Sequence, residues 1–444
     1  MTDVETAGPS LGAVVAARLD LRWSVYADPF QLGLEALVGL AVRRNPRRAQ
    51  LVVSTVLAKH IPARPASVRA AGLLLAARVQ QALTGDVPAG LDAGLLTDPG
   101  RSADVEARAQ GAFEGAPLVI GFCETATALG HFVADAFTHG DYLHTTRRPD
   151  PLRPVAAVFE EEHSHAVSHV LQPDGLLLAD GRPLVLVDDE LTTGTTALNT
   201  LAALHARHPR SAYVLAALLD LRPEAARLAF QTRAAALGVP VTVVALLDGV
   251  LEVPLDALNR AEGLLAATEA AEPPDQNPST TTVIRWPCGV PTGGRHGFLA
   301  TDRPAFTHAV EAAARALTLS AEGPVLVVGT EELMYAPVRV AHALELALRR
   351  TGKAREVLVQ STTRSPVVAL DVPGYAIRRA LVTTSPDDPS RPSFLYNLQP
   401  GYDDIVVVTE DPADRCAGLL RALRPWARTG VHLLVLDPPE VAPR

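Results

Sequence analysis

Short apolar runs recur along this chain, and segments with helical spacing of apolar residues lie between them. In the first half the runs are residues 118–120, 184–187, 211–219 and 239–247, and the helical segments include residues 197–205 and 223–238. Continuous apolar runs of this length are typical of strands buried on both faces. Strands and helices that alternate in this way predict an α/β fold, with a mostly parallel sheet covered by helices on both faces.

One of these strands, in residues 183–198 (PLVLVDDELTTGTTAL), is joined to polar residues suited to binding a sugar phosphate. Asp188 and Asp189 follow the strand, and the turn into the next helix contains Thr192, Thr193, Gly194, Thr195 and Thr196. Backbone N–H groups and threonine hydroxyls at a helix N-terminus converge on one point, where the helix dipole also favours negative charge. Ionised carboxylates only accept hydrogen bonds, so the two aspartates suit ribose hydroxyls. The stretch therefore predicts a site for a ribose 5-phosphate.

A polar strand-to-helix turn capped by threonine is the structural alternative for this stretch. Such a turn requires neither two adjacent carboxylates nor four threonines around a glycine. A Walker loop is a poorer description, because the lysine that would reach further phosphates is absent and the acidic pair precedes the turn.

The sequence VDDELTTGTT at residues 187–196 closely resembles the phosphoribosyl-diphosphate (PRPP) binding signature of type I phosphoribosyltransferases. Further segments extend the resemblance over nearly the whole chain: residues 43–46 (RRNP), 59–62 (KHIP), 124–127 (ETAT), 161–166 (EEHSHA) and 363–366 (TRSP). Together they resemble the phosphoribosyltransferases encoded near tellurium-resistance and stress-response genes, whose C-terminal domain is named for the Thr-Arg-Ser-Pro sequence. The resemblance implies a type I phosphoribosyltransferase-like parallel sheet.

The function implied by the resemblance is the transfer of phosphoribose from PRPP to an unidentified small acceptor, with Mg²⁺ as cofactor and release of pyrophosphate. The product would be a nucleotide-like metabolite of a biosynthetic pathway. A non-catalytic protein that senses PRPP or a nucleotide is the alternative, because the sequence does not identify a pocket for the acceptor.

The resemblance also assigns roles to residues. Asp188 and Asp189 become the catalytic pair at the ribose, and residues 192–196 bind the 5-phosphate. The diphosphate is expected to contact Glu124, Thr125, Ala126, Thr127, Lys59 and Arg147. A planar guanidinium binds two phosphate oxygens at once, which makes Arg147 and Arg148 candidate clamps. A carboxylate beside a diphosphate makes sense mainly with Mg²⁺ between them, so Mg²⁺ is expected mainly through PRPP, with Asp188, Asp189 or Glu124 as further ligands.

A charged segment between the two strand motifs corresponds to the mobile loop of type I enzymes, and its candidate residues are Glu162, His163 and His165. A transition-metal site and a merely solvated loop are the alternatives, although side chains that alternate along an extended chain cannot all face one ion without a turn. Cys123 lies at the position of a nucleophile, but a small buried thiol is the preferred interpretation because no base is evident beside it.

The second half repeats the first in a weaker form. Residues 266–282 are rich in proline and polar residues and predict a linker, which divides the chain into a phosphoribosyltransferase domain at 1–265 and an α/β domain of similar build at 283–444. Residues 324–333, 356–366, 396–400 and 405–412 parallel residues 117–137, 142–149, 169–173 and the acidic strand, in the same order. Chance similarity of generic strand-helix units is the alternative.

This second domain is expected to be degenerate, because Pro412 replaces the threonine and glycine turn and proline has no N–H to donate. Glu331, Arg364, Ser365 and Tyr396 are candidates for a ligand of its own, or they could merely shape the domain interface.

Composition limits the range of partners. The chain has 444 residues, 48% of them apolar, and a net charge of −9, which argues against a broad nucleic-acid-binding face. Its three cysteines have no metal-ligand spacing, and no stretch approaches the roughly 18 apolar residues of a membrane span. No signal peptide is evident, so we expect a cytoplasmic protein with small-molecule partners and no membrane contact, compatible with a homodimer.

Overall fold

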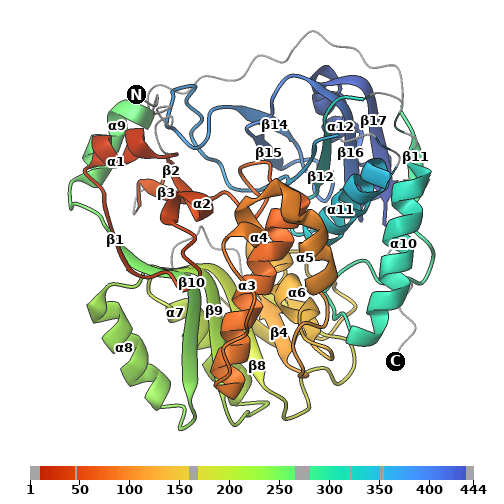
Figure 1. The fold of residues 1–444 in the computed structure, drawn as a ribbon. Helices are drawn as coiled ribbons and strands as arrows, with labels where there is room; N and C mark the ends of the chain where they lie inside the picture. The colour runs from red at the N-terminus through yellow and green to blue at the C-terminus, as the bar shows by residue number, and fades with distance from the viewer. Residues whose placement is uncertain are drawn as a thin grey trace, which may run out of the picture.

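The computed structural model describes residues 11–45, 48–159, 169–265, 281–317, 319, 322–350, 352 and 355–436. Two sheets form its framework (Figure 1). The first has the order β1-β10-β9-β8-β4-β5, with bounds Arg22–Ala27, Val241–Glu252, Tyr213–Asp220, Leu184–Leu191, Leu118–Gly121 and Asp141–His144. All its neighbouring strands are parallel except β1 and β10. The predicted strands at 118–120, 184–187, 211–219 and 239–247 are thus strands of one sheet.

The second sheet is built from the second half of the chain. Its order is β11-β17-β16-β12-β13, with bounds Val283–Arg285, Ala427–Val435, Tyr402–Thr409, Val325–Gly329 and Val357–Ser361. All of its neighbouring strands are parallel. Within the described residues, three two-stranded antiparallel sheets accompany these two: β2 (Val38–Val42) with β3 (Gln50–Ser54), β6 (Ala157–Phe159) with β7 (His169–Leu171), and β14 (Ala380–Thr384) with β15 (Pro392–Tyr396).

The larger described helices are α3 (Pro65–Thr84), α6 (Ala126–Asp135), α7 (Thr195–His205), α8 (Glu224–Ala235), α10 (Arg303–Ala316) and α11 (Tyr335–Arg350). Shorter ones are α1 (Ala13–Leu19), α2 (Leu34–Leu37), α4 (Gly94–Thr97), α5 (Ser102–Arg108), α9 (Ala257–Leu265) and α12 (Ala417–Leu423). Single 3₁₀ turns are Pro99–Arg101, Ala300–Asp302 and Arg424–Trp426. Among the helices described here, none combines the length and apolar character needed to cross a membrane.

Helices cover both faces of each sheet, which explains why the strand sequences are continuously apolar. In β8, Val185 and Val187 belong to the cluster that includes α3 and α6, whereas Leu184 and Leu186 pack with α7 and α8. The second sheet follows the same rule, with β12 packed against α11 on one face and α12 on the other. The predicted α/β class, with helices on both faces and a second domain of similar build, is confirmed.

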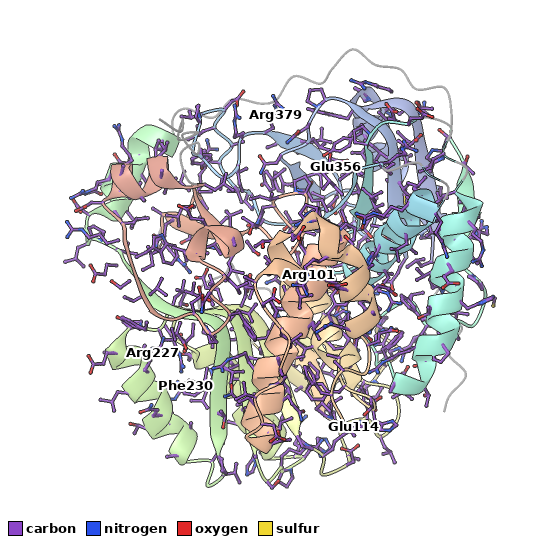
Figure 2. The ribbon with its side chains drawn as sticks, viewed as in Figure 1. Arg101, Glu114, Arg227, Phe230, Glu356 and Arg379 are labelled. Atoms are coloured by element: carbon purple, nitrogen blue, oxygen red, sulfur yellow. The ribbon has the colours of Figure 1, made fainter. Side chains whose placement is uncertain are left out.

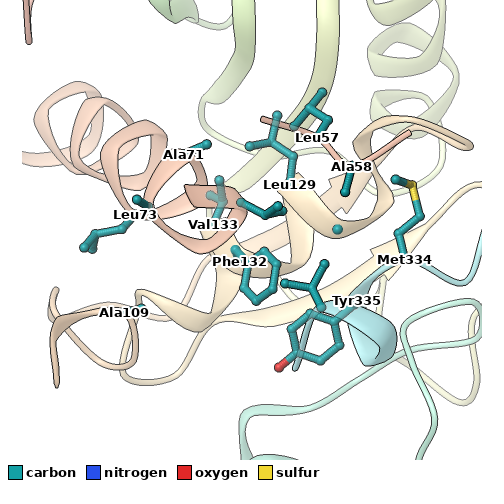
Figure 3. Packing of buried hydrophobic residues seen from close by; sticks show 14 of the residues in the cluster. Leu57, Ala58, Ala71, Leu73, Ala109, Leu129, Phe132, Val133, Met334 and Tyr335 are labelled. Atoms are coloured by element: carbon teal, nitrogen blue, oxygen red, sulfur yellow. The ribbon is translucent and has the colours of Figure 1, made fainter. Parts of the chain in front are cut away.

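The two halves share a hydrophobic core at the contact of α3, α6 and α11 (Figures 1 and 3). In Figure 3, Phe132 of α6 lies beside Tyr335 of α11, and their ring centroids are 5.0 Å apart. On its other side, α6 approaches α3 so closely that a Cβ built at Gly72 would lie 2.2 Å from Cβ of Phe132. Only glycine allows this approach, so the sequence of α3 is adapted to the helix that packs on it.

The repeat is preserved in strand order and register. Chain segments β4, β5, β8 and β9 occupy the same relative places as β12, β13, β16 and β17. Gly121 pairs with His144 and Val187, and Gly329 pairs with Ser361 and Val408, so these glycines are equivalent.

One predicted correspondence within the repeat was wrong by three residues. Thr146 bridges Val170 and Thr363 bridges Phe394, so Ser393, rather than Tyr396, is the counterpart of His169. The error arose because the register of a strand in a hairpin is set by its pairing with the partner strand. The pattern of apolar and polar residues in one strand does not reveal this pairing. The predicted linker lies largely outside the described residues.

Candidate functional site

A cleft of about 430 Å³ lies at the carboxyl ends of β4 and β8 and brings ten of the predicted site residues together. Ligands of parallel α/β sheets characteristically bind at this edge. From the first half its lining includes Lys59, Glu124, Thr125, Arg147, Asp188, Asp189, Thr192 and Thr196. From the second half it includes Arg364, Ser365 and Pro366. The cleft therefore lies between the two halves.

Strand β8 continues through the acidic pair to Leu191, four residues beyond the predicted end. Asp188 and Asp189 are half-buried on the cleft wall, and the N–H of Asp189 donates to Oδ1 of Asp188 at 2.9 Å. Because both carboxylates still have access to the cleft, they are placed to accept hydrogen bonds from hydroxyl groups of a ligand.

The loop after β8 turns sharply into α7 at Gly194, whose φ is +75°. A Cβ at this position would lie 2.8 Å from the ring of Phe230 on α8, a residue labelled in Figure 2. Glycine is therefore required both by the conformation and by the space. Thr192 and Thr196 line the cleft on either side of this turn, and Thr193 accepts a hydrogen bond from the N–H of Thr195 at 3.2 Å.

The loop after β4 provides two of its four predicted residues to the cleft. The Cys123–Glu124 peptide is cis, and Glu124 and Thr125 line the cavity. Ala126 is buried in the core at the start of α6. Thr127 faces the second half instead, where its hydroxyl donates to the backbone oxygen of Glu332 at 3.0 Å.

Glu124 is surrounded by basic side chains from three segments of the chain. Its carboxylate lies 3.7 Å from Nζ of Lys59, 3.7 Å from Nη1 of Arg147 and 3.5 Å from Nε of Arg364. The hydroxyl of Thr363 donates to Oε2 of Glu124 at 2.8 Å. Since the Glu124 side chain is only 2% exposed, the carboxylate acts as a shared buried counterion that gathers the three cations at the cleft.

Metal binding in this cleft can be tested against the donor groups present. Among the described residues, no three His, Cys, Asp or Glu side chains come together as ligands for a metal ion. Glu124 does not fit the role of a Mg²⁺ ligand, because basic groups already surround it. Asp188 and Asp189 fit better, since hard oxygen ligands on the wall of an open cleft suit a cation that arrives with an anionic ligand.

The two candidate clamps of the Thr-Thr-Arg-Arg-Pro segment have different positions. Arg147 lines the cleft and donates from Nε to Nε2 of His169 at 2.9 Å. Arg148 turns to the second half, where it pairs with Asp411 at 2.6 Å and Asp387 at 2.9 Å. Arg147 thus lies at the cleft, whereas Arg148 belongs to the contact between the halves.

Cys123 has a histidine beside it that the sequence did not suggest. Its Sγ lies 3.6 Å from Nδ1 of His169, but burial raises the pKa of the thiol well above its usual value. The group is therefore a neutral thiol at physiological pH, which makes a nucleophilic role unfavourable.

Further basic residues on the cleft wall are Arg43, Arg44 and Arg48, together with the polar Asn45. Arg48 donates to Oε1 of Glu190 at 2.5 Å, and this acidic neighbour raises the pKa of Arg48. His60 also lines the cleft; burial, together with the nearby Lys59, lowers its pKa well below the usual value, so its imidazole is neutral. The pairing of Arg48 with Glu190 was not predicted from the sequence.

The four candidates of the second half do not surround a ligand site of their own. Arg364 and Ser365 line the cleft described above. Glu331 is buried and accepts from Nε of Arg364 at 2.7 Å and from Ser385 at 2.9 Å. Tyr396 is buried beneath the loop, and its hydroxyl donates to the backbone oxygen of Ser365 at 2.7 Å. The candidates thus form and support one rim of the first-half cleft.

The predicted mobile-loop residues Glu162, His163 and His165 lie outside the described residues.

Comparison with protein families finds a matching family model for each half of the chain. The family model described as phosphoribosyl transferase matches residues 37–250. A second model, described as the TRSP domain C-terminal to that transferase family, matches residues 292–423.

Comparison with solved structures finds adenine phosphoribosyltransferases. The enzyme from Trypanosoma brucei, in complex with AMP, pyrophosphate and ribose-5-phosphate, is 17% identical, with 37% of this chain and 71% of that chain covered and a TM-score of 0.24. The enzyme from Leishmania donovani is 17% identical over 36% and 71% of the two chains, with a TM-score of 0.24. The Giardia lamblia enzyme complexed with 9-deazaadenine is 17% identical over 34% and 84%, with a TM-score of 0.23. A comparison with curated proteins gives no match.

Proposed function

The chain belongs to the phosphoribosyltransferases that carry a C-terminal TRSP domain, and on that premise we propose that it uses PRPP to phosphoribosylate a small acceptor, with Mg²⁺ as cofactor. The observation that carries the proposal is the meeting of a threonine and glycine loop, an acidic pair and several cations in one cleft. These three groups match the three parts of PRPP, which are its 5-phosphate, its ribose and its diphosphate.

The 5-phosphate would bind the loop between β8 and α7. Backbone N–H groups at the start of a helix attract a phosphate through hydrogen bonds and the helix dipole. The hydroxyls of Thr192 and Thr196 border the cleft at this loop and would complete the binding site. Asp188 and Asp189 lie directly upstream, where they would accept hydrogen bonds from the ribose hydroxyls.

The diphosphate would lie near Thr125, Lys59 and Arg147. Nζ of Lys59 donates to Oγ1 of Thr125 at 2.7 Å, which holds the lysine over the loop after β4. When bound with PRPP, Mg²⁺ would supply further neutralisation of the leaving diphosphate. The protein's part in the reaction would be to hold the diphosphate and the ribose in fixed positions. Meanwhile the bond from the anomeric carbon to the pyrophosphate oxygen would break, and a bond from this carbon to the acceptor would form.

Charge development at the sugar gives the acidic pair its catalytic role. Displacement of pyrophosphate through an oxocarbenium-like state places positive charge on the ribose. Carboxylates that are already oriented beside the ring stabilise such charge without reorganisation during the reaction. Asp189 is the residue to which we assign this stabilisation, and its backbone N–H orients the neighbouring carboxylate of Asp188 through a 2.9 Å hydrogen bond.

Calorimetric titration of PRPP in the presence of Mg²⁺ tests the proposal. We expect binding by the native protein and a loss of about tenfold or more in Asp188→Asn/Asp189→Asn, because hydrogen bonds to charged groups contribute about 1.5–3 kcal/mol each. Asp256→Asn, which removes an exposed carboxylate, is the matched control and should bind normally. Absence of binding by the native protein, or unchanged binding by the double variant, would contradict the proposal.

Turnover distinguishes an enzyme from a sensor. Incubation with PRPP, Mg²⁺ and cell extract should release pyrophosphate and yield a new phosphoribosylated mass. Tight PRPP binding without pyrophosphate release would instead favour a sensing role.

A further inference from the structure

The repeated segments of the two halves face each other and exchange equivalent contacts. The hydroxyl of Thr146 donates to Oε2 of Glu332 in the second half at 2.6 Å. Its counterpart Thr363 donates to Oε2 of Glu124 in the first half at 2.8 Å. Glu124 and Glu332 each stand three residues after an equivalent glycine. The two halves are therefore related by an approximate twofold arrangement at this contact.

Local contacts inside each half obey the same correspondence. The N–H of Cys123 donates to Oγ1 of Thr145 at 2.9 Å, and the N–H of Glu331 donates to Oγ1 of Thr362 at 3.1 Å. These matched bonds anchor the two loops at equivalent points, although the Cys123–Glu124 peptide is cis and Glu331 instead has a φ of +52°. The arginines that follow, Arg147 and Arg364, consequently start from equivalent backbone positions.

The arginine side chains break this symmetry. Nη1 of Arg147 lies 3.7 Å from Glu124 of its own half, and Nε of Arg364 lies 3.5 Å from the same carboxylate. Both guanidinium groups therefore lie at the first-half cleft. Glu332 has a different guanidinium beside it, that of Arg295, at 3.5 Å.

The equivalent position in the second half is closed by its own side chains. Arg295 pairs with Glu410 at 2.6 Å and, with Glu332, borders a cavity of only about 20 Å³. Although burial alone would raise it, the pKa of Glu332 is lowered to about 2 by Arg295 and by further polar contacts. This carboxylate stays charged and paired, and the space is too small for a phosphate group.

Arg364 retains capacity to bind a ligand. Its Nε is committed to Glu331 at 2.7 Å, whereas its buried Nη2 makes no hydrogen bond with any described residue and has Oδ2 of Asp387 as an ionic neighbour at 3.6 Å. A buried donor without an acceptor is costly, and a phosphate oxygen would satisfy it. The fork of a guanidinium is well suited to this anion, because its donors can reach two oxygens in one plane.

We infer that the second half completes the active cleft of the first, with Arg364 as a binding residue for the diphosphate of the substrate. The inference rests on the proposed function. Glu124 and Glu331 act as positioning residues that hold the guanidinium at the rim. Tyr396 positions the following turn, since its hydroxyl accepts from the N–H of Val367 and donates to the oxygen of Ser365, both at 2.7 Å.

The test compares two probes, Mg²⁺-pyrophosphate and ribose 5-phosphate, by calorimetry on the full-length chain. Arg364→Ala should weaken pyrophosphate binding by about tenfold or more, since the removed bonds are to a charged group. The same variant should bind ribose 5-phosphate within about twofold of the native protein, because that ligand depends on the loop after β8. A collapsed cleft would lose both ligands, so retained ribose 5-phosphate binding separates a direct contact from a structural effect.

Arg391→Ala is the matched control. Arg391 is the other cation on Glu331, at 2.9 Å, but it does not line the cleft. It should leave pyrophosphate binding within about twofold. If Arg364→Ala does not fold, Arg364→Lys keeps a charge beside Glu331 without the planar fork and should lose about threefold to tenfold in pyrophosphate affinity.

The outcomes are distinct. Equal pyrophosphate affinity in the native protein and the Arg364 variants would overturn the inference and leave the proposed function intact. Equal losses in the Arg364 and Arg391 variants would also overturn it, by assigning the effect to Glu331. Failure of the native protein to bind either probe would overturn the proposed function and the inference with it.

Discussion

At the scale of single residues, Glu124 shows how a buried carboxylate can gather basic side chains at a cleft. Its charge offsets cations that would otherwise repel one another, and its burial keeps them in place. The basic side chains at this part of the cleft are thus gathered around a negative group of the protein itself. This use differs from a Mg²⁺ ligand, the role considered from the sequence.

Replacing this one charge should therefore affect stability and binding in opposite ways. We expect Glu124→Gln to lower the free energy of unfolding by about 3 kcal/mol, because Lys59, Arg147 and Arg364 lose their common buried counterion. Pyrophosphate should raise the melting temperature more in this variant than in the native protein, since an anion replaces the missing charge.

Thermal melts with and without pyrophosphate measure both effects. Glu356→Gln removes an exposed carboxylate of the second half, labelled in Figure 2, and should change neither quantity. A Glu124→Gln protein as stable as the native one would show that the cations do not depend on this carboxylate.

At the scale of elements, the loop between β8 and α7 depends on one backbone conformation. Gly194 has a φ of +75°, and the turn brings Thr192 and Thr196 to the cleft. The strand before it is held by apolar residues on both faces of the sheet, and the helix after it packs against one of these faces. The loop can therefore be precise although its own side chains are polar and partly exposed.

Gly194→Ala should strain this loop without altering any polar group. The left-handed conformation costs a non-glycine residue about 1–2 kcal/mol, and the close approach to Phe230 adds to this cost. We expect a lower melting temperature and weaker binding of ribose 5-phosphate, measured by calorimetry. Gly181→Ala, in a position with no atom within 4 Å of the added Cβ, should change neither. Native affinity in the Gly194 variant would contradict this account of the loop.

At the scale of the whole molecule, the two halves contact each other through buried aromatic groups as well as through the residues that line the cleft. His131 of α6 lies between Tyr142 of the first half and Tyr335 of the second, with ring centroids 4.3 and 3.4 Å away. Burial, with nearby basic groups, lowers the pKa of His131 well below the usual 6.5. The contact between the halves is therefore built around a neutral imidazole.

Stability should consequently fall in mild acid. Below about pH 6.5 the histidine of the unfolded chain takes up a proton while the folded one does not, so folding loses up to about 1.4 kcal/mol per pH unit for each such group. Above that pH the contribution is fully present. Urea unfolding at pH 7 and pH 5 should show a smaller difference in His131→Phe than in the native protein. An unchanged difference would exclude His131 as a source of the pH dependence.

Much of the fold could be predicted from local patterns. Apolar runs long enough for a strand imply burial on both faces, and the threonine and glycine turn after Asp188 and Asp189 implies a polar loop at a helix start. These features depend on residues that are close together in the sequence, so the amino-acid sequence alone is enough to predict them. The repeat of strand order between the halves was detectable for the same reason.

The pairing of charges was decided only by the tertiary structure. Glu124 and Arg364 are 240 positions apart, and no local pattern indicates that they share one cleft. Nor does the sequence distinguish Arg147, which lines the cleft, from Arg148, which pairs with Asp411. Residues close together in the sequence set the backbone conformation of each loop. Which buried charges neutralise one another depends instead on which loops lie side by side once the hydrophobic cores have packed. For this protein, the sequence determined the threonine and glycine loop after the acidic strand and the weaker repeat in the second half, and the tertiary structure decided that both halves border the same cleft.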